Sequence, residues 1–335
     1  MKLEDRIHSF GLLGQYISDY SDSLADCVRL AGVKNHWFTE QNSQFALRHI
    51  AANFFDEDKI LSFIQKFPNV EQRPKRVGLV ADDLVPLDSF QEIFYILMSG
   101  HSLQLKSSES GLPLIKELLT QLTQIDNRWS SYFSINERWI STDAVILHSP
   151  KINKTHYEAY FKGKPILSLN KKHSIAIIHG NESQEDLVAL GHSVFDFFGF
   201  SDRNISLIWL PKNTSPQFLA ESWKEFADLM QFETYKNNMD YHRTLYLLKG
   251  LPIVDCDFAN LVEDINIISP PSCVHIVYYE NIQEVNNWIY QNKALINQVV
   301  NSNFEGQETG FHNNLLPQID EFRGNVNIID FLSQQ

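Results

Sequence analysis

A lysine and several hydroxyl side chains occur where the sequence could meet a ligand. The segment VGLVADDLVPLDSF, residues 77–90, is followed by SGHSLQLKSSES, residues 99–110. This order predicts a strand, a turn with proline, a helix and a second strand that ends near Lys106. A lysine at the carboxyl end of a strand in an α/β sheet is well placed to contact a phosphate or a ribose. The alternative interpretation is a solvated lysine at the end of a strand.

The standard catalytic and binding motifs do not occur in the sequence. There is no G-x-G-x-x-G, G-x-x-x-x-G-K, H-E-x-x-H or G-x-S-x-G, and no two histidines are spaced i, i+4. The three cysteines, Cys27, Cys256 and Cys273, are too far apart for paired metal ligands and are odd in number. We therefore predict no metal site and no disulfide framework, which is typical of a reducing cytosol.

The composition limits the class of partner. Forty-one acidic residues against 28 basic ones give a formal charge of −13, so a nucleic-acid surface is not expected. No apolar run approaches the roughly 18–20 residues of a membrane span, and the charged start MKLEDRIHSF does not resemble a signal peptide. We expect a cytoplasmic protein with no nucleic-acid partner and no membrane span.

The elements that must position these residues change in type along the chain. Apolar residues recur at helical spacing from Leu3 to Ile17, and Thr39 and Asp56 are candidate N-caps of further helices. From residue 75 short apolar runs alternate with helical patterns, which indicates βαβ units and a mainly parallel sheet. Asp88 and Gly100 are expected to bound one of these helices.

The pattern predicts an α/β fold of two lobes with a cleft between them and a helical N-terminal region. We expect residues 1–74 to be helical and to pack on the first lobe, residues 75–178 to form a dinucleotide-binding type of lobe, and residues 179–300 to form a catalytic type of lobe. The second lobe is expected to contain helices at residues 183–198 and 282–296. Residues 301–335 are expected to form a C-terminal segment that contributes oligomer contacts.

Nearly the whole chain resembles the acyl-CoA reductase family of the bioluminescence (LuxC) type, a branch of the aldehyde dehydrogenase superfamily. The resemblance rests on segments that occur in the same order with compatible spacing. They are LEDRIHSFGLLGQYI, NHWFTEQNSQFALRHIA, VPLDSF, SGHSLQLKSS, HYEAYFKGKP, SIAIIHGNESQEDLVALGHSVFDFFGF, RNISLIWLP and PQIDEFRGNVNIIDFL.

The resemblance implies a two-step reduction of a thioester to an aldehyde. A cysteine thiolate takes the acyl group from acyl-CoA or an acyl carrier, and NADPH then supplies hydride. An asparagine side chain and a backbone N–H stabilise the oxyanion. By resemblance, the cofactor positions are Lys106, Ser108, His148, Ser149 and Gly180. The family also implies a homo-oligomer or a complex with a related subunit, and no metal.

The chain departs from the family pattern at three positions with different chemical tasks. The family's nucleophile lies in a stretch resembling F-G-L-G-C-R-N-V-S, and Asp202 stands at the cysteine position here. Leu84 stands at the oxyanion asparagine position. His148, Ser149 and Pro150 replace the T-G-S-like turn near the cofactor. Removing one oxyanion donor typically costs about a hundredfold to a thousandfold in rate.

These departures leave three hypotheses open. The chain is a family member that binds a ligand without reducing it, an active enzyme that uses another nucleophile, or a partner that stabilises a related subunit. In the second case Ser201 with His179 as its base is the candidate pair, and Glu182 is a candidate general base. Structural roles are the alternatives for His179, Glu182 and the three cysteines.

Overall fold

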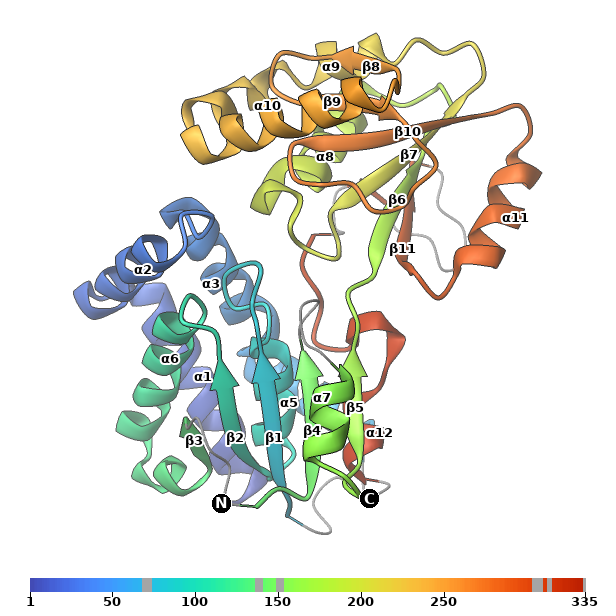
Figure 1. Ribbon diagram of the computed structural model, residues 1–335. Coiled ribbons are helices and arrows are strands. Elements are labelled where there is room, and N and C mark those ends of the chain that lie inside the picture. Colours follow the sequence, from blue (N-terminus) through green and yellow to red (C-terminus); the bar gives the residue numbers. More distant parts are fainter. Residues whose placement is uncertain (68–73, 136–140, 149–153, 303–309, 312–314, 334–335) are drawn as a thin grey trace. The chain divides into compact units, whose positions relative to one another are not determined.

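The computed structural model describes residues 1–67, 74–135, 141–148, 154–302, 310–311 and 315–333 (Figure 1). The chain forms two compact units, of which unit 1 contains Met1–Asn170 and Pro317–Gln335 and unit 2 contains Lys171–Leu316. Unit 2 is therefore an insertion into unit 1. The division differs from the one expected at residues 178 and 300, because His173–Ile177 is a strand of the second sheet.

Unit 1 consists of a parallel sheet with helices on both faces. Its helices are α1 (Leu3–Asp19), α2 (Asp22–Lys34), α3 (Glu40–Phe54), α4 (Glu57–Ile64), α5 (Phe90–Met98), α6 (Leu112–Ile125), α7 (Lys154–Tyr160) and α12 (Ile328–Ser333), with short 3₁₀ helices at Asn127–Ser131 and Arg323–Asn325. Its strands are β1 (Arg76–Ala81), β2 (Ser102–Ser107), β3 (Phe133–Ile135), β4 (Ala144–His148) and β5 (Ile166–Leu169).

Unit 2 is a second α/β layer structure. Its helices are α8 (Gln184–Phe195), α9 (Gln217–Ser222), α10 (Glu233–Leu248) and α11 (Ile282–Asn292), with 3₁₀ helices at Asp196–Gly199 and Lys224–Gln231. Its strands are β6 (His173–Ile177), β7 (Ile205–Pro211), β8 (Ile253–Asp255), β9 (Asn260–Glu263), β10 (Cys273–Tyr279) and β11 (Ile296–Asn301). The two α/β units and the helices α1–α4 confirm the expected fold class.

The first sheet has the strand order β3-β2-β1-β4-β5, and every pair is parallel. The order reverses between β1 and β4, and ligands of open α/β sheets bind outside the carboxyl ends of the strands at such a point. Val80, Val145 and Leu147 pack against Tyr157 and Phe161 on the α7 side. Helices α5 and α12 lie together on the other side of this sheet (Figure 1).

The N-terminal helices share an aromatic core with α5. The Phe10 ring lies 5.1 Å from Phe94 and 5.7 Å from Trp129, and the Phe54 ring lies 5.5 Å from Phe94, all near edge to face. The expected caps are confirmed, since Thr39 accepts a hydrogen bond from Asn42 N–H and Asp56 from Lys59 N–H. Together these contacts make α1–α4 part of unit 1.

The expected N-cap at Asp88 is wrong. Helix α5 begins after Ser89, whose side chain makes no capping bond. The Asp88 carboxylate contacts Arg323 and His148 instead. Gly100, with φ of +76°, follows the end of α5 as expected, because glycine adopts the left-handed conformation without a Cβ clash.

The second sheet has the order β11-β6-β7-β10-β9-β8, and all its pairs are parallel except β8 with β9. Two expected helices are shorter than predicted. The helix expected at residues 183–198 ends at Phe195 and continues as a 3₁₀ turn, and the one expected at residues 282–296 ends at Asn292. Ile296 is instead the first residue of β11, which pairs with β6.

No helix in the described part of the chain has the length and apolar character that a membrane span requires.

Candidate functional site

Four expected site residues lie at the carboxyl edge of the first sheet. Leu84 follows β1 and is half-buried, Lys106 is exposed near the end of β2, Ser108 follows β2, and His148 ends β4. Parallel strands bring these ends to the same edge of the sheet. The N–H of Asp82 donates to the carbonyl of His148 at 3.0 Å, which fixes the loop after β1 to the end of β4.

A buried ionic cluster lies beside these strand ends. It consists of Asp83, Asp88, Glu92, His148 and Arg323, and every member belongs to unit 1. His148 Nε2 lies 3.4 Å from Asp88 Oδ2, and His148 Nδ1 lies 3.1 Å from Glu92 Oε2. The Arg323 guanidinium contacts Asp88 Oδ1 and lies 3.5 Å from Glu92 Oε1. The C-terminal segment thus supplies one of the two cations.

The pKa of the histidine and of each of the three carboxyl groups in the cluster is shifted. Burial and Arg323 oppose protonation of His148, but Glu92 and Asp88 outweigh them and raise its pKa to about 10. Against the opposing effect of burial, Arg323 and His148 hold the pKa of Asp88 well below its usual range, and the same two cations lower the pKa of Glu92. Burial raises the pKa of Asp83 to about 7. His148 is therefore an imidazolium at neutral pH.

The edge fits part of a dinucleotide. The exposed ammonium of Lys106 suits a ribose hydroxyl or a phosphate. Ser108 Oγ already accepts a hydrogen bond from the Gly111 N–H at 3.3 Å. His148 is ion-paired in the cluster, and Ser149 lies outside the described residues. A pyrophosphate would meet the carboxylates around these strand ends, so the described residues fit the ribose half but not the pyrophosphate.

Ser201 and Asp202 lie at the amino edge of the second sheet, just before β7. They are 6% and 7% exposed. Ser201 Oγ accepts a hydrogen bond from Arg203 N–H at 3.2 Å, and Ser174 Oγ, at the start of β6, donates to the Asp202 carbonyl at 2.9 Å. The serine hydroxyl and the main chain of the aspartate therefore already take part in the local hydrogen bonding of the turn.

The turn before Ser201 has an unusual backbone. Phe197, Phe198 and Gly199 have φ values of +52°, +57° and +79°. Two successive aromatic residues in the left-handed region are strained, and such strain concentrates at functional sites. Lys171 Nζ donates to the carbonyl of Phe200 at 3.0 Å and ties the first residue of unit 2 to this turn.

His179, Gly180 and Glu182 lie at the opposite, carboxyl edge of the second sheet. The parallel register pairs Ser174 with Ile205 and Ile177 with Trp209. Strand β7 has seven residues, which span about 20 Å at ~3.3 Å per residue. Since His179 follows β6 whereas Ser201 precedes β7, the structure does not bring the serine and its candidate base together.

Glu182 is held by hydrogen bonds from its own turn. Its two carboxylate oxygens accept from the N–H groups of His179 at 2.7 Å and Gly180 at 2.9 Å. The hydroxyl of Ser302 donates a further bond at 3.2 Å. Gly180 adopts φ of +91°, which explains the glycine at this turn. These contacts are a structural role for Glu182.

The cysteines lie in surroundings that disfavour the thiolate. Burial raises the pKa of Cys273 to about 12, and burial together with Glu117 raises the pKa of Cys27 to about 11. Cys256 is buried, and its thiol lies 3.0 Å from the Ala259 carbonyl. Because the thiolate is the nucleophilic form, these environments make Cys27 and Cys273 poor nucleophiles at neutral pH.

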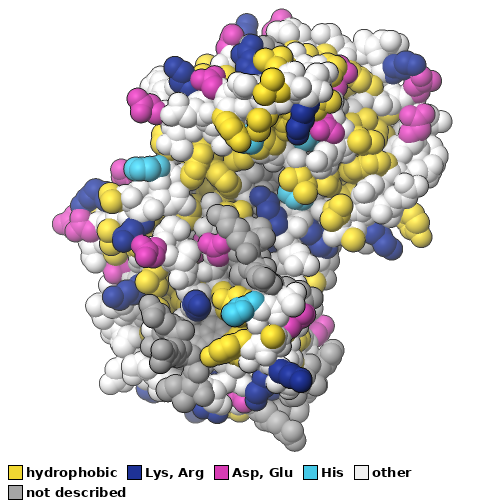
Figure 2. Space-filling model, in the orientation of Figure 1, with side chains coloured by type: hydrophobic (Ala, Val, Ile, Leu, Met, Phe, Trp, Pro, Cys, Tyr) yellow, Lys and Arg dark blue, Asp and Glu magenta, His cyan; other side chains and the backbone are white. Residues whose placement is uncertain are grey.

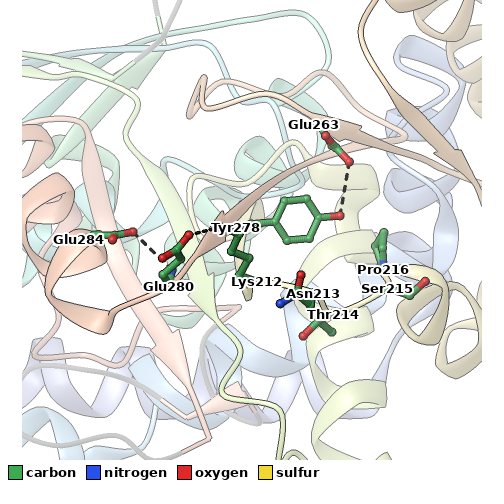
Figure 3. Close-up of a pocket in the computed structure, with 9 residues that line it drawn as sticks. All are labelled: Lys212, Asn213, Thr214, Ser215, Pro216, Glu263, Tyr278, Glu280 and Glu284. Carbon is green, nitrogen blue, oxygen red and sulfur yellow. Dashed lines mark hydrogen bonds and ion pairs between the residues drawn. The ribbon is translucent and has the colours of Figure 1, made fainter.

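A groove of about 660 Å³ lies at the carboxyl edge of the second sheet. Figure 3 shows the Tyr278 ring of β10 between Glu263 of β9 and Lys212 after β7. Tyr278 OH donates to Glu263 at 3.4 Å, and Lys212 pairs with Glu280. Glu284 adds a third carboxylate, so the groove has more negative than positive charge and repels phosphate groups.

Sequence reasoning missed the residues that hold both candidate sites in place. Arg323, Ser174 and Lys171 contact the loops of the expected site residues, but each contacts them across 28 or more positions of sequence. The positive charge of Arg323 in the C-terminal segment was the one signal that could have indicated its role.

On the face drawn in Figure 2, the described basic and acidic side chains are interspersed rather than gathered by sign.

Within the described ranges, no group of three or more His, Cys, Asp or Glu side chains is arranged to hold a metal ion.

Comparison with known proteins finds similarity in structure. No family model matches the sequence, and no curated protein matches it significantly. A putative aldehyde dehydrogenase from Burkholderia cenocepacia aligns with a TM-score of 0.66 and 11% identity over 91% of this chain and 76% of its own. An acetylating aldehyde dehydrogenase from Geobacillus thermoglucosidasius aligns at 0.62 and 8% over 90% and 76%. The NAD⁺ complex of the Bacillus cereus aldehyde dehydrogenase aligns at 0.60 and 10% over 90% and 72%.

These similarities establish the fold. The chain has the same α/β fold as these aldehyde dehydrogenases, which is the fold that the sequence resemblance implied. About a tenth of the residues are identical in these alignments, so the similarity concerns the fold.

Arg323 is expected to stabilise unit 1 through its ion pairs in the buried cluster. Arg323→Met leaves Asp88 and Glu92 with one buried cation, and breaking a buried ion pair typically costs about 3–5 kcal/mol. We expect hydrogen exchange of the α5 amides to show a loss of this size in the free energy of opening. Arg128→Met removes exposed ion pairs with Asp5 and Asp126 and should have a much smaller effect, because exposed pairs contribute little to stability. Equal losses in the two variants would contradict this account of the cluster.

Proposed function

We propose that this protein binds an acyl thioester, either acyl-CoA or an acyl carrier, without reducing it. The observation that carries the proposal is Asp202 at the position where the resemblance implies a nucleophilic cysteine. A carboxylate there would form a mixed anhydride, and its negative charge would oppose the anionic tetrahedral intermediate. Leu84, at the implied oxyanion position, has no side-chain hydrogen bond to donate.

The surroundings of Asp202 support the non-catalytic assignment. Ser201 is engaged with the Arg203 N–H, and the turn is pinned by Ser174 and Lys171. The pKa of the Cys27 and Cys273 thiols is raised, and neither cysteine belongs to the turn before β7. The alternative is an active enzyme that uses Ser201, and it requires a base that the geometry of His179 does not supply.

Lys106 is the residue we assign to ligand binding at the first sheet. Its exposed ammonium at the carboxyl end of β2 suits the ribose phosphate of NADPH. Structures of the same fold include NAD complexes, from Bacillus cereus and from Sinorhizobium meliloti. We propose that a nicotinamide nucleotide is held mainly through its adenosine half, because Lys106 is the cation that we assign to its ribose phosphate.

A second candidate role is that of a self-associating structural subunit. Leu247 and Leu248 end α10, and Ile265 and Ile268 lie in the loop after β9, with exposed fractions from 55% to 80%. His275 joins these segments, since its ring nitrogens lie 2.8 Å from Tyr246 OH in α10 and 2.5 Å from the carbonyl of residue 266 in the loop.

The chemistry around this surface suits a second copy of the chain. Strand β8 is the edge of the sheet beside α10, and edge strands are open to pairing. Lys249 and Asp264 place opposite charges around the apolar side chains, because both act on the His275 ring. Two copies related by a twofold axis could therefore pair the lysine of one with the aspartate of the other.

The non-catalytic proposal predicts that the purified protein does not oxidise NADPH in response to acyl-CoA. It also predicts no acyl adduct by mass spectrometry at any chain length, together with calorimetric binding of acyl-CoA. Iodoacetamide should label the thiols slowly in the native protein and fully after denaturation, which is the internal control. Steady NADPH oxidation that depends on acyl-CoA, or a stable acyl adduct, would contradict the proposal.

The ligand assignment predicts that Lys106→Ala weakens NADPH binding about tenfold. Loss of one charge-assisted hydrogen bond, about 1.5–3 kcal/mol, is enough for such a change. Lys116→Ala, which removes an exposed lysine from α6 in the same unit, should leave calorimetric affinity unchanged. Unchanged affinity in Lys106→Ala would refute the assignment.

The self-association role predicts a dimer at micromolar concentration in sedimentation velocity. Leu248→Asp should convert the dimer to a monomer, because it places a charge in the apolar surface. Val33→Asp, at an equally exposed position of α2 in unit 1, should remain dimeric. A wild-type monomer at 100-fold higher concentration, or dissociation of both variants, would rule out this surface.

A further inference from the structure

The buried ionic cluster has an unequal number of acids and bases. Asp83, Asp88 and Glu92 supply three carboxyl groups, whereas His148 and Arg323 supply two cations. The ion pairs of the cluster join these two cations to Asp88 and Glu92. Asp83 is the carboxyl group that is left over.

Among the described residues, no lysine or arginine forms an ion pair with Asp83. Its Oδ1 accepts a hydrogen bond from the Ser89 N–H at 3.2 Å, and the residue is 2% exposed. Its Oδ2 is buried with no hydrogen-bond partner among the described residues. A Cβ built on Gly111, at the start of α6, would lie 3.0 Å from this oxygen and 3.2 Å from Ser107 Oγ. The α6 side of Asp83 is thus tightly packed and brings no positive side chain.

The charge count makes the cluster neutral only when Asp83 carries a proton. Ionised Asp83 would add an uncompensated buried charge beside Asp88 and Glu92, which is costly at low polarity. We propose that Asp83 is a proton-operated switch, which holds the loop from Asp82 to Ser89 closed when protonated and releases it when ionised.

The effects of the groups that face Asp83 add up to a raised pKa, which supports this assignment. Burial is the largest effect and raises the pKa of Asp83 to about 7; His148 and the Ser89 hydrogen bond oppose the shift, and Asp88 and Glu92 add to it. The ordinary value is 3.8, so between about pH 4 and 7 the folded state binds more protons than the unfolded state. The contribution of Asp83 to stability is therefore present at low pH and is lost as the pH rises through about 7.

Among the other members of the cluster, Asp88 and Glu92 act in acid, whereas the effect of His148 also changes above neutral pH. Asp88 and Glu92 stabilise the fold above their ordinary pKa values and lose this effect only in acid. His148 stabilises below its ordinary value of 6.5, and this effect is lost as the pH rises toward 10. Removing the titration of Asp83 alone therefore isolates its contribution near neutral pH.

The loop that Asp83 controls is the one that carries Leu84. The N–H of its first residue, Asp82, donates to the carbonyl of His148. Near its other end, the Asp88 carbonyl accepts a hydrogen bond from Arg323. Hydration of an ionised Asp83 requires these contacts to open. The carboxyl edge of the first sheet would then present a different surface above neutral pH than below it.

Hydrogen–deuterium exchange at pH 6 and pH 8, corrected for intrinsic rates, tests the switch on the full chain. One pH unit above its pKa a carboxyl group is about tenfold more often ionised than protonated, so protection of residues 82–89 should fall about tenfold at pH 8. Asp83→Asn mimics the protonated carboxyl and should lose about tenfold less protection than the wild type between pH 6 and pH 8; the loss that remains in this variant comes from His148. Asp196→Asn, which removes a half-buried carboxyl of unit 2 whose pKa burial also raises, should respond like the wild type.

The same pH response in the wild type and in Asp83→Asn would overturn the proposal. If Asp83→Asn does not fold, carbon-13 NMR of the aspartate-labelled wild type decides the matter directly. A carboxyl resonance that titrates near pH 7 and persists in Asp196→Asn supports the switch. The lack of any aspartate titrating between pH 6 and 8 excludes it. Neither readout depends on thioester binding, so failure here is distinct from failure of the proposed function.

Discussion

The ionic cluster of two cations and three carboxyl groups joins the C-terminal segment to the rest of unit 1. Arg323 contacts Asp88 across 235 positions of sequence, so the cluster joins the two segments of unit 1 that lie on either side of unit 2 in the sequence. Neighbouring contacts follow the same route, with Tyr95 OH bonded to the Ile319 carbonyl and Gln91 to the Glu321 carbonyl. Because a buried charge cannot lose its partner cheaply, the C-terminal segment is a structural part of unit 1.

A second constraint comes from the two edges of a parallel sheet. Groups that share chemistry must lie at one edge, because a strand of ordinary length separates the edges by more than any side chain can reach. In unit 2 Ser201 and Asp202 lie at the amino edge, whereas His179, Glu182 and the acidic groove lie at the carboxyl edge. The sheet register thus weakens the enzymatic hypothesis independently of the missing thiol.

The fold could be predicted from the sequence where a local pattern was strong. Helical spacing and the caps at Thr39 and Asp56 identified the first helices, and alternation of short apolar runs identified the α/β class. The strands Ile166–Leu169, Asn260–Glu263 and Ile296–Asn301 were not foreseen, since the first two have only four residues and the last two are half polar. Their assignment depends on pairing with strands that are distant in sequence.

The site was harder to predict for a physical reason. A resemblance to a family indicates which residues of this chain occupy the family's site positions. It does not indicate what each side chain contacts. His148 was expected beside a cofactor, yet its imidazolium is neutralised by Asp88 and Glu92. Asp88 was expected to cap a helix, yet its carboxylate binds Arg323. Pairings between distant charged residues carry no local signal, so only the folded structure reveals them.

The residues at the expected catalytic positions share one property that bears on function. Side chains that act on a substrate are held with unsatisfied hydrogen-bonding capacity or strain, which the substrate relieves. Here Glu182 accepts three hydrogen bonds from its own unit, and Ser201 and His148 are similarly engaged. Strain persists at Phe197 and Phe198, in the turn that precedes the nucleophile position. These satisfied hydrogen bonds support the proposal that the chain binds a thioester without reducing it.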